Sequence, residues 1–318
     1  MVDMKRYALA CPGQGIIPLG CLAPFSKFRP SISCQLDQID EALGEKFSNH
    51  LFNTDLTFNS HWLSDTANAQ PAILASTFLS LEVFRRQHNI DLASSASYIL
   101  GHSLGEFTAL TLAGILDLSC AVKTVRKRAN LMKEVVLKYP ATYVMYALLV
   151  KPQNWQSVVD LARSESILAN INSTLQVVIS GTEAQISEFR SSSSKLIMRA
   201  VKLPVSIPFH NQILTSIEPE LREFLMSQTL AEPKVPIISN YSGSVSSTKN
   251  EILSNTVSAT SAPVQWVESL KTLNDQDVSV ISLGPGSVMH SLNKKAVSSI
   301  LLQTPDDFPS IISGIKLP

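Results

Sequence analysis

Residues 97–113 read Ser-Tyr-Ile-Leu-Gly-His-Ser-Leu-Gly-Glu-Phe-Thr-Ala-Leu-Thr-Leu-Ala. The opening apolar run predicts a short buried strand, and the stretch that starts at Gly105 predicts a helix. Between them, Gly101-His102-Ser103-Leu104-Gly105 fits the pattern G-x-S-x-G, which marks a nucleophile elbow when it joins a strand to a helix. The sequence therefore predicts an α/β fold with Ser103 exposed at the edge of a sheet. A plain glycine turn is the alternative interpretation.

Strands and helices alternate along the rest of the chain. Short apolar runs at 6–11, 235–240 and 278–283 predict further strands, and residues 71–86 and 118–137 show helical spacing of apolar side chains. Such alternation favours a core built on a largely parallel sheet.

A second, local group of elements occupies the middle of the chain. Its order is strand, helix, strand, helix, strand, at residues 143–150, 155–162, 176–180, 183–190 and 195–203. This order can close a small sheet of its own. We expect a subdomain at residues 138–206, inserted into a catalytic core formed by residues 1–137 and 207–318.

The composition excludes several classes of protein. The 318 residues contain 26 Lys+Arg and 26 Asp+Glu, so the formal net charge is zero, which argues against a nucleic-acid partner. No window holds the roughly 20 consecutive apolar residues of a membrane helix. The four cysteines form no C-x-x-C pair and the six histidines are scattered, so we expect neither a metal site nor a cofactor.

A serine nucleophile needs a base and a place for the developing negative charge. His210 follows an extended segment stiffened by Pro204 and Pro208 and is the candidate base, although a lone histidine is often an ordinary core or surface imidazole. The amide of Leu104 lies where the helix begins and is the candidate oxyanion donor. His102 is expected to point away from the exposed tip of the elbow.

The glycine turn Gly13-Gln14-Gly15 follows the first predicted strand. Its backbone N–H groups can approach the same sheet edge as Ser103. The turn is not G-x-G-x-x-G, so we reject a dinucleotide-binding fingerprint.

Arg128 falls on the apolar side of the helix expected at 118–137, together with Val125 and Met132. A guanidinium that faces an apolar side needs an anion, because burying it unpaired is costly. One interpretation is an ion pair with an internal Asp or Glu. The other is a bidentate clamp for a substrate carboxylate, which suits the planar fork of arginine.

A set of short segments, spread over nearly the whole chain, forms one recognisable combination. It consists of Pro12-Gly13-Gln14-Gly15, Gln70-Pro71-Ala72, Gly101-His102-Ser103-Leu104-Gly105-Glu106, Arg128, Asn172-Ser173, Gln176-Val177-Val178-Ile179-Ser180-Gly181, Pro208-Phe209-His210, Pro263-Val264-Gln265-Trp266 and Gly284-Pro285-Gly286. In this order the segments resemble the malonyl-CoA:acyl-carrier-protein transacylases and the acyltransferase domains of fatty acid and polyketide synthases. The resemblance implies an α/β-hydrolase-like core with an inserted ferredoxin-like subdomain.

The resemblance also implies an activity and catalytic roles. The expected activity is transfer of a malonyl group from malonyl-CoA to the phosphopantetheine thiol of holo acyl carrier protein, supplying fatty acid synthesis. Ser103 matches the nucleophile and His210 the base, and the main-chain N–H groups of Gln14 and Leu104 match the oxyanion hole.

Further matches concern substrate and orientation. Arg128 matches the arginine that binds the malonyl carboxylate, and Asn172 matches a residue near the entrance of the active site. Gln265 matches the residue whose main-chain carbonyl orients the histidine, so no carboxylate is required for a triad.

Two other functions use the same residues. A serine thioesterase or other hydrolase would pass the acyl group to water, but it has no use for a buried Arg128. A degenerate acyltransferase kept as a binding partner would not need intact Ser103, His210 and Arg128.

The segment 207–211, Ile-Pro-Phe-His-Asn, and the modest glycine count resemble fungal mitochondrial members more than bacterial ones. We therefore expect a mitochondrial protein, and as a separate expectation a monomer. The first glycine turn begins at residue 12, which leaves little room for a long transit peptide, so the cytoplasm is the alternative.

Overall fold

Two separate β-sheets organise the computed structural model, which describes residues 6–15 and 17–315, with residues 58–60 described by their backbone alone. The larger sheet has six strands in the order β10-β9-β1-β2-β7-β8. Their bounds are β1 (Tyr7–Cys11), β2 (Tyr98–Gly101), β7 (Ile237–Ile238), β8 (Val245–Ser246), β9 (Ser279–Leu283) and β10 (Ser299–Leu302). All neighbouring pairs are parallel except β7 with β8. The α/β class predicted from the sequence is confirmed.

Helices cover both faces of this sheet, which explains the continuous apolar sequence of β1. Leu9 and Cys11 pack into one buried cluster, while Ala8 and Ala10 pack into another. A strand buried on both faces reads as an unbroken apolar run, as expected for a parallel sheet. The surrounding helices are α1 (Ser33–Leu43), α2 (Ser48–Phe52), α3 (Leu56–Ser64), α4 (Thr66–His88), α5 (Gly105–Leu112), α6 (Leu118–Lys138), α9 (Glu218–Met226), α10 (Lys249–Ser258), α11 (Trp266–Asn274), α12 (Val288–Asn293) and α13 (Phe308–Gly314).

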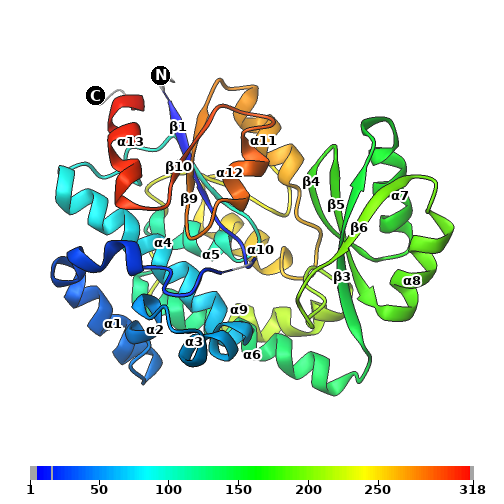
Figure 1. Cartoon of the computed structure of the whole chain (residues 1–318), viewed down its shortest axis with the longest axis horizontal. Helices are drawn as coiled ribbons and strands as arrows, with labels where there is room; N and C mark the ends of the chain where they lie inside the picture. The colour runs from blue at the N-terminus through cyan, green and yellow to red at the C-terminus, as the bar shows by residue number, and fades with distance from the viewer. Residues whose placement is uncertain (1–5, 16, 316–318) are drawn as a thin grey trace.

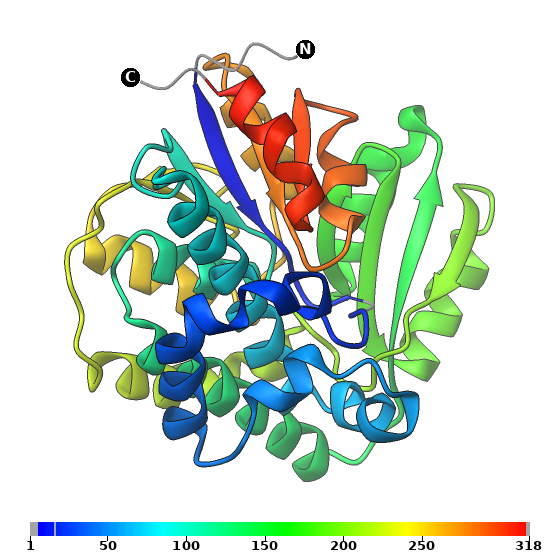
Figure 2. The ribbon, with the colours of Figure 1, turned by 60° about the vertical axis from the view of Figure 1, so that its left-hand side comes forward.

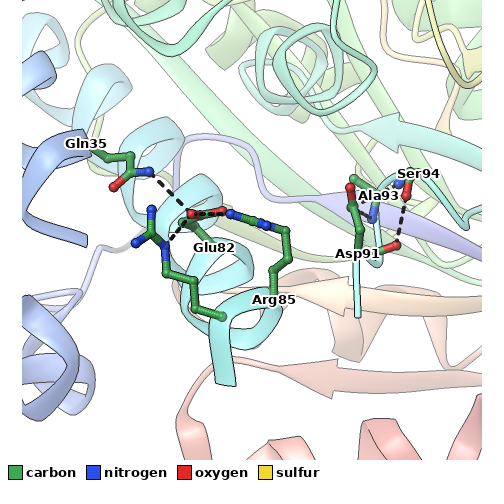
Figure 3. Close-up of polar contacts among 7 residues, drawn as sticks. Gln35, Glu82, Arg85, Asp91, Ala93 and Ser94 are labelled. Atoms are coloured by element: carbon green, nitrogen blue, oxygen red, sulfur yellow. Dashed lines mark hydrogen bonds and ion pairs between the residues drawn. The ribbon is translucent and has the colours of Figure 1, made fainter. Parts of the chain in front are cut away.

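The long helix α4 is fixed at both ends. Asp65 caps its start, because the carboxylate accepts the Ala67 amide at 2.9 Å. Near its end, the buried Glu82 accepts hydrogen bonds from Arg85 and Arg86 (Figure 3). Asn89 then adopts a left-handed φ of 54° and ends the helix. After this helix end the chain turns and continues into β2, the strand that leads to Ser103.

The smaller sheet has four strands in the order β4-β5-β3-β6, and all of its pairs are antiparallel. Its elements are β3 (Tyr143–Val150), α7 (Trp155–Ser164), β4 (Leu168–Ser173), β5 (Gln176–Thr182), α8 (Glu183–Ser192) and β6 (Ile197–Lys202). This is the β-α-β-β-α-β order of a ferredoxin-like unit. Helices α7 and α8 lie on the outer side of the sheet, to the right in Figure 1.

The sequence did not predict β4. This strand carries Asn170 and Asn172, a residue type depleted in strands, and its pairing with β5 has two irregularities of register. The limits 138–206 for a subdomain stay a prediction, and the outer limits 1 and 318 of the core lie outside the described residues.

Two segments of the core are joined to the small sheet by backbone hydrogen bonds and one side chain. Val264 donates to Ala169 and accepts from Ile171, both at 2.9 Å. Asn211 Nδ2 donates to the Ser180 carbonyl at 2.8 Å. The small sheet is therefore attached next to His210 on one segment and close to the start of α11 on the other.

The C-terminal helix closes the core on the other side. Both views place α13 (red) beside β1 (blue) (Figure 1, Figure 2). Phe308 of α13 packs edge-on against Phe84 of α4, with ring centroids 5.0 Å apart. Within residues 6–15 and 17–315, no helix combines the length and the apolar character needed to cross a membrane.

Candidate active site

Ser103 lies in a sharp turn between β2 and α5, with a left-handed φ of 53°. A Cβ atom on Gly101 would lie 1.9 Å from the Gly105 carbonyl oxygen, and one on Gly105 would lie 2.4 Å from the Cys11 carbonyl oxygen. Glycine is therefore required at both positions. A non-glycine residue in this conformation costs about 1–3 kcal/mol, which is typical of a functional site.

His210 faces Ser103 across a hydrogen bond of 2.7 Å between Nε2 and Oγ. Its Nδ1 atom lies 2.9 Å from the Ala259 carbonyl and 3.1 Å from the Ala262 carbonyl. Because a carbonyl only accepts, these contacts hold the proton of the neutral ring on Nδ1. Nε2 is then free to accept the proton of the Ser103 hydroxyl.

The expectation that the Gln265 carbonyl orients His210 is wrong in this structure. Gln265 is the N-cap of α11, and its carbonyl accepts the amide and the hydroxyl of Ser269, each at 3.0 Å. The Gln265 carbonyl is therefore occupied by hydrogen bonds in the first turn of α11. The carbonyls that contact His210 Nδ1 belong instead to Ala259 and Ala262, which precede this helix.

The electrostatic setting keeps His210 neutral. Burial is the main cause that lowers the pKa of His210 to about 3, and the nearby charges of Arg128 and His102 lower it further. The two carbonyl contacts oppose this shift only partly. At neutral pH the ring is therefore an acceptor, the state that a general base requires.

Two backbone N–H groups on the wall of the cavity next to Ser103, those of Gln14 and Leu104, are the candidates for an oxyanion hole. Leu104 is buried directly before α5, and Gln14 follows β1 on the neighbouring strand. Across the described chain, no hydrogen-bond acceptor is bonded to the amide of either residue. Free N–H groups at a helix start favour a negative charge.

Arg128 is buried on α6, with 2% of its surface exposed. Its Nη1 donates to Gln70 Oε1 at 2.9 Å, and its Nε has no hydrogen-bond partner. No ion pair joins Arg128 to a carboxylate in the described residues, so the first of the two interpretations is not what the structure contains. Burial lowers the pKa of Arg128 to about 10, which leaves the guanidinium charged at neutral pH.

One cavity of about 250 Å³ brings these residues together. Its walls include every residue expected at the site except Gln265, namely Ser103, His210, Gln14, Leu104, Arg128 and Asn172. Asn172 Oδ1 lies 2.9 Å from His102 Nε2, and its amide nitrogen donates to Gln176. His102 is thus bonded to the small sheet and not to Ser103. Among the described residues, no group of His, Cys, Asp or Glu is arranged to hold a metal ion.

The model of the family described as acyl transferase domain matches residues 28–310, which is most of the chain. The chain belongs to the acyl transferase family. A malonyl CoA-acyl carrier protein transacylase of Bacillus subtilis is 33% identical to it, over 98% of both chains.

Solved structures agree with this assignment. The malonyl CoA-acyl carrier protein transacylase of Coxiella burnetii superimposes with a TM-score of 0.87 at 25% identity, over 99% of both chains. A type II PKS acyl-carrier protein in complex with its malonyl-transacylase matches with a TM-score of 0.85 at 25% identity, over 97% of this chain and 99% of that one. The predicted resemblance to this family is confirmed, as is the large α/β core with a small ferredoxin-like unit.

In this acyl transferase, the side chain of Asn240 forms hydrogen bonds with two backbone groups of the elbow, a role that the sequence did not reveal. Its Oδ1 accepts the Ser103 amide at 2.8 Å, and its Nδ2 donates to the Gly101 carbonyl. Its own amide donates to Glu106 Oε1 at 3.1 Å. The only available signal was a polar residue at the carboxyl end of the strand predicted at 235–240, the end where sites form in parallel sheets.

Glu106, which directly follows the elbow motif in the first turn of α5, is buried in this acyl transferase. Burial raises its pKa to about 7, against the opposing effects of the Asn240 amide, the Ser239 hydroxyl and the charge of Arg128. The carboxyl therefore titrates near neutral pH, within the structure that supports Ser103.

Proposed function

We propose that this acyl transferase moves the malonyl group of malonyl-CoA to the phosphopantetheine thiol of acyl carrier protein, for fatty acid synthesis. The observation that carries the proposal is Arg128, a buried cation on the wall of the Ser103 cavity that lacks a carboxylate partner. A malonyl thioester brings the missing carboxylate, whereas an acetyl thioester does not. The names of the relatives, and the carrier protein in the matched complex, support the same substrates.

In the first half of the proposed reaction, Ser103 Oγ attacks the thioester carbonyl while His210 Nε2 takes the hydroxyl proton. The carbonyl oxygen becomes an oxyanion held by the amides of Gln14 and Leu104. As the C–S bond breaks, His210 returns the proton to the leaving sulfur, and coenzyme A departs as its thiol. The malonyl group remains as an ester on Ser103.

The second half runs the same steps with a new thiol. The pantetheine thiol of the carrier protein gives its proton to His210 and attacks the ester carbonyl. When the C–O bond breaks, the proton passes to Ser103 Oγ and restores the hydroxyl. The same base and the same oxyanion donors therefore serve both half-reactions.

Intact-protein mass spectrometry tests the proposal. Malonyl-CoA should add one malonyl group to the wild-type protein and none to Ser103→Ala, and holo acyl carrier protein should remove it as malonyl carrier protein. Loading by acetyl-CoA under the same conditions should be much weaker. An adduct that water removes as fast as the carrier protein does would instead identify a hydrolase.

The mitochondrial location and the monomeric state belong to the same proposal. The location is supported by the likeness of residues 207–211 to fungal mitochondrial members, while the relatives named above are bacterial. Cell fractionation with a tagged full-length chain tests the location, and light scattering in solution tests the monomer.

A further inference from the structure

A chain of hydrogen bonds runs from Arg128 to the glycine turn that contains Gln14. Arg128 Nη1 donates to Gln70 Oε1 at 2.9 Å, and Gln70 Nε2 donates to Thr66 Oγ1 at 3.2 Å. The Thr66 hydroxyl then donates to Gln14 Oε1 at 2.7 Å. Every donor points in the same direction, away from the guanidinium. Hydrogen bonds arranged in this way polarise one another in a poorly solvated interior.

Helix α4 fixes the two middle members of this chain. Thr66 and Gln70 are four residues apart in its first turns, so their side chains lie on one face. Gln70 is fully buried and Thr66 is 6% exposed. Asp65 caps the helix directly before Thr66. The hydroxyl of Thr66 is therefore presented from a rigid element.

The turn at Gln14 is packed on one side only, because Gly13 lies against His102, where a Cβ atom would come within 2.6 Å of the carbonyl oxygen. The cavity of about 250 Å³ that contains Ser103 lies against Gln14, and so does a second cavity of about 340 Å³ lined by Thr66 and Lys133. A Cβ atom on Gly15 would meet nothing within 4 Å. Gln14 lies between two glycines, whose backbone angles are not restricted by a side chain of their own, and the Gly15 side is unobstructed. The hydrogen bond from Thr66 is thus the described side-chain contact that anchors Gln14.

We infer that Thr66 is a positioning residue, which keeps the Gln14 peptide turned with its N–H toward the oxyanion. Gln70 connects this anchor to Arg128, so the acyl carboxylate and the oxyanion hole are linked through two side chains. The inference rests on the proposed function, since it assigns Gln14 to the oxyanion hole and Arg128 to the substrate carboxylate. It predicts that Thr66 acts on the rate of acyl transfer and not on the binding of the thioester.

Thr66→Val is the decisive variant because it keeps the shape of the side chain and removes the hydroxyl. Loss of one oxyanion donor lowers kcat by about 10²–10³-fold, so a misdirected donor should lower the loading rate of Ser103 by at least about 10-fold. The KM for malonyl-CoA should change little. Acetyl-CoA loading should fall by the same factor, since both thioesters form an oxyanion. Thr66→Ser should retain most of the wild-type rate.

The matched control is Thr124→Val, a buried threonine on α6 whose hydroxyl donates to the Cys120 carbonyl of its own helix. It should leave both loading rates unchanged. The Tm of each variant is measured, and the loading rates are compared at a temperature at which all variants are folded. If Thr66→Val loads at the wild-type rate, or if Thr66→Ser loses as much as Thr66→Val, the inference is overturned.

Gln70→Leu tests the connection to Arg128. It should slow malonyl loading more than acetyl loading, because Arg128 loses its hydrogen bond to Gln70. In the double variant with Thr66→Val, the combined loss of malonyl loading should be smaller than the product of the single losses. A combined loss equal to the product of the two single losses would overturn the linking role of Gln70. Wild-type protein that loads acetyl-CoA but not malonyl-CoA would refute the proposed substrate, and Thr66→Val would still test the anchor with acetyl-CoA.

Discussion

Ser103 Oγ and His210 Nε2 lie 2.7 Å apart, and both residues hold a left-handed backbone, with φ of 53° and 58°. Neither residue is a glycine, so both ends of this hydrogen bond are built at a local cost in stability. Contacts around both residues must therefore stabilise these two backbone conformations. At Ser103, Asn240 bonds the serine amide and the Gly101 carbonyl. At His210, two carbonyls hold Nδ1.

The first prediction concerns the strain at Ser103. Ser103→Ala and Ser103→Gly should both abolish covalent loading, because both remove the hydroxyl. The glycine variant should nevertheless be more stable than the alanine variant by about 1 kcal/mol, since glycine adopts a left-handed φ without the steric cost. Urea unfolding of the two variants measures this difference.

Ser187, an exposed residue within α8, provides the matched pair. There the order should reverse, with alanine more stable than glycine by about 1 kcal/mol, because the position is helical. Equal stabilities of the two Ser103 variants would show that the elbow is not strained.

The second prediction concerns the base. His210→Ala should lower the rates of both half-reactions by about 10²–10⁴-fold. Because the pKa of His210 is lowered to about 3, the ring stays neutral from pH 8 down to about pH 5. The kcat/KM for malonyl loading should therefore show no acid limb from this residue in that range.

The measurement is a pH–rate profile by stopped-flow or quenched mass spectrometry, taken in wild type and in Glu106→Gln. The second protein lacks the Glu106 carboxyl, which titrates near neutral pH at this site. An acid limb close to pH 6.5 in both proteins would show that His210 is far better solvated than the structure implies.

The elbow could be predicted because all of its parts are contiguous in the sequence. The strand, the glycines, Ser103 and the helix follow one another within a few residues, and the steric reason for Gly101 lies inside the motif, at the Gly105 carbonyl. The partners of His210 could not be predicted in the same way. Ala259 and Ala262 act through carbonyls, which every residue possesses, and only the tertiary fold selects them.

Asn240 shows a second limit. It bonds Ser103 across 137 positions of sequence, and nothing in the local pattern specifies that distance. The strand β4 illustrates a third limit, because its two asparagines face the cavity and hide the apolar alternation of an ordinary strand. In each case a polar group was placed by function and by tertiary contacts, and secondary-structure propensity was overridden.

The third prediction concerns Glu106. Its pKa is raised from 4.5 to about 7 in the folded protein, so the native state keeps a proton that the unfolded chain has already lost between these values. The stability that this group contributes is fully present below pH 4.5 and is lost as the pH rises through 7. At 1.36 kcal/mol per pKa unit, the loss amounts to about 3 kcal/mol.

Glu106→Gln removes the titration and keeps an oxygen that can accept the Asn240 amide. The free energy of unfolding of the variant minus that of wild type should therefore rise between pH 5 and pH 8. Urea unfolding at four pH values gives this difference, in which the contributions of all other groups largely cancel. A difference that does not change with pH would show that the carboxyl is not protonated in the native protein.

The last prediction concerns Arg128, which separates malonyl transfer from general acyl transfer. Its guanidinium is buried, unpaired at Nε and exposed to the Ser103 cavity. Truncating one member of a buried charge pair typically costs about 2–5 kcal/mol, which corresponds to about 30- to 4,000-fold. Arg128→Ala should therefore lose malonyl loading by such a factor while acetyl loading is retained or increased. Acetyl-CoA brings no second charge that would remain unpaired.

Arg128→Lys should restore malonyl loading only in part, since an ammonium cannot make the planar two-point contact with a carboxylate. Arg126, on the same helix, pairs with Glu45 at 2.8 Å, and Arg126→Ala is the matched control that should leave the malonyl-to-acetyl ratio unchanged. The ratio is measured from the loading rates of each variant with both thioesters. If Arg128→Ala slows both thioesters equally, the guanidinium does not bind the malonyl carboxylate, and the choice of malonyl-CoA as substrate loses its physical basis.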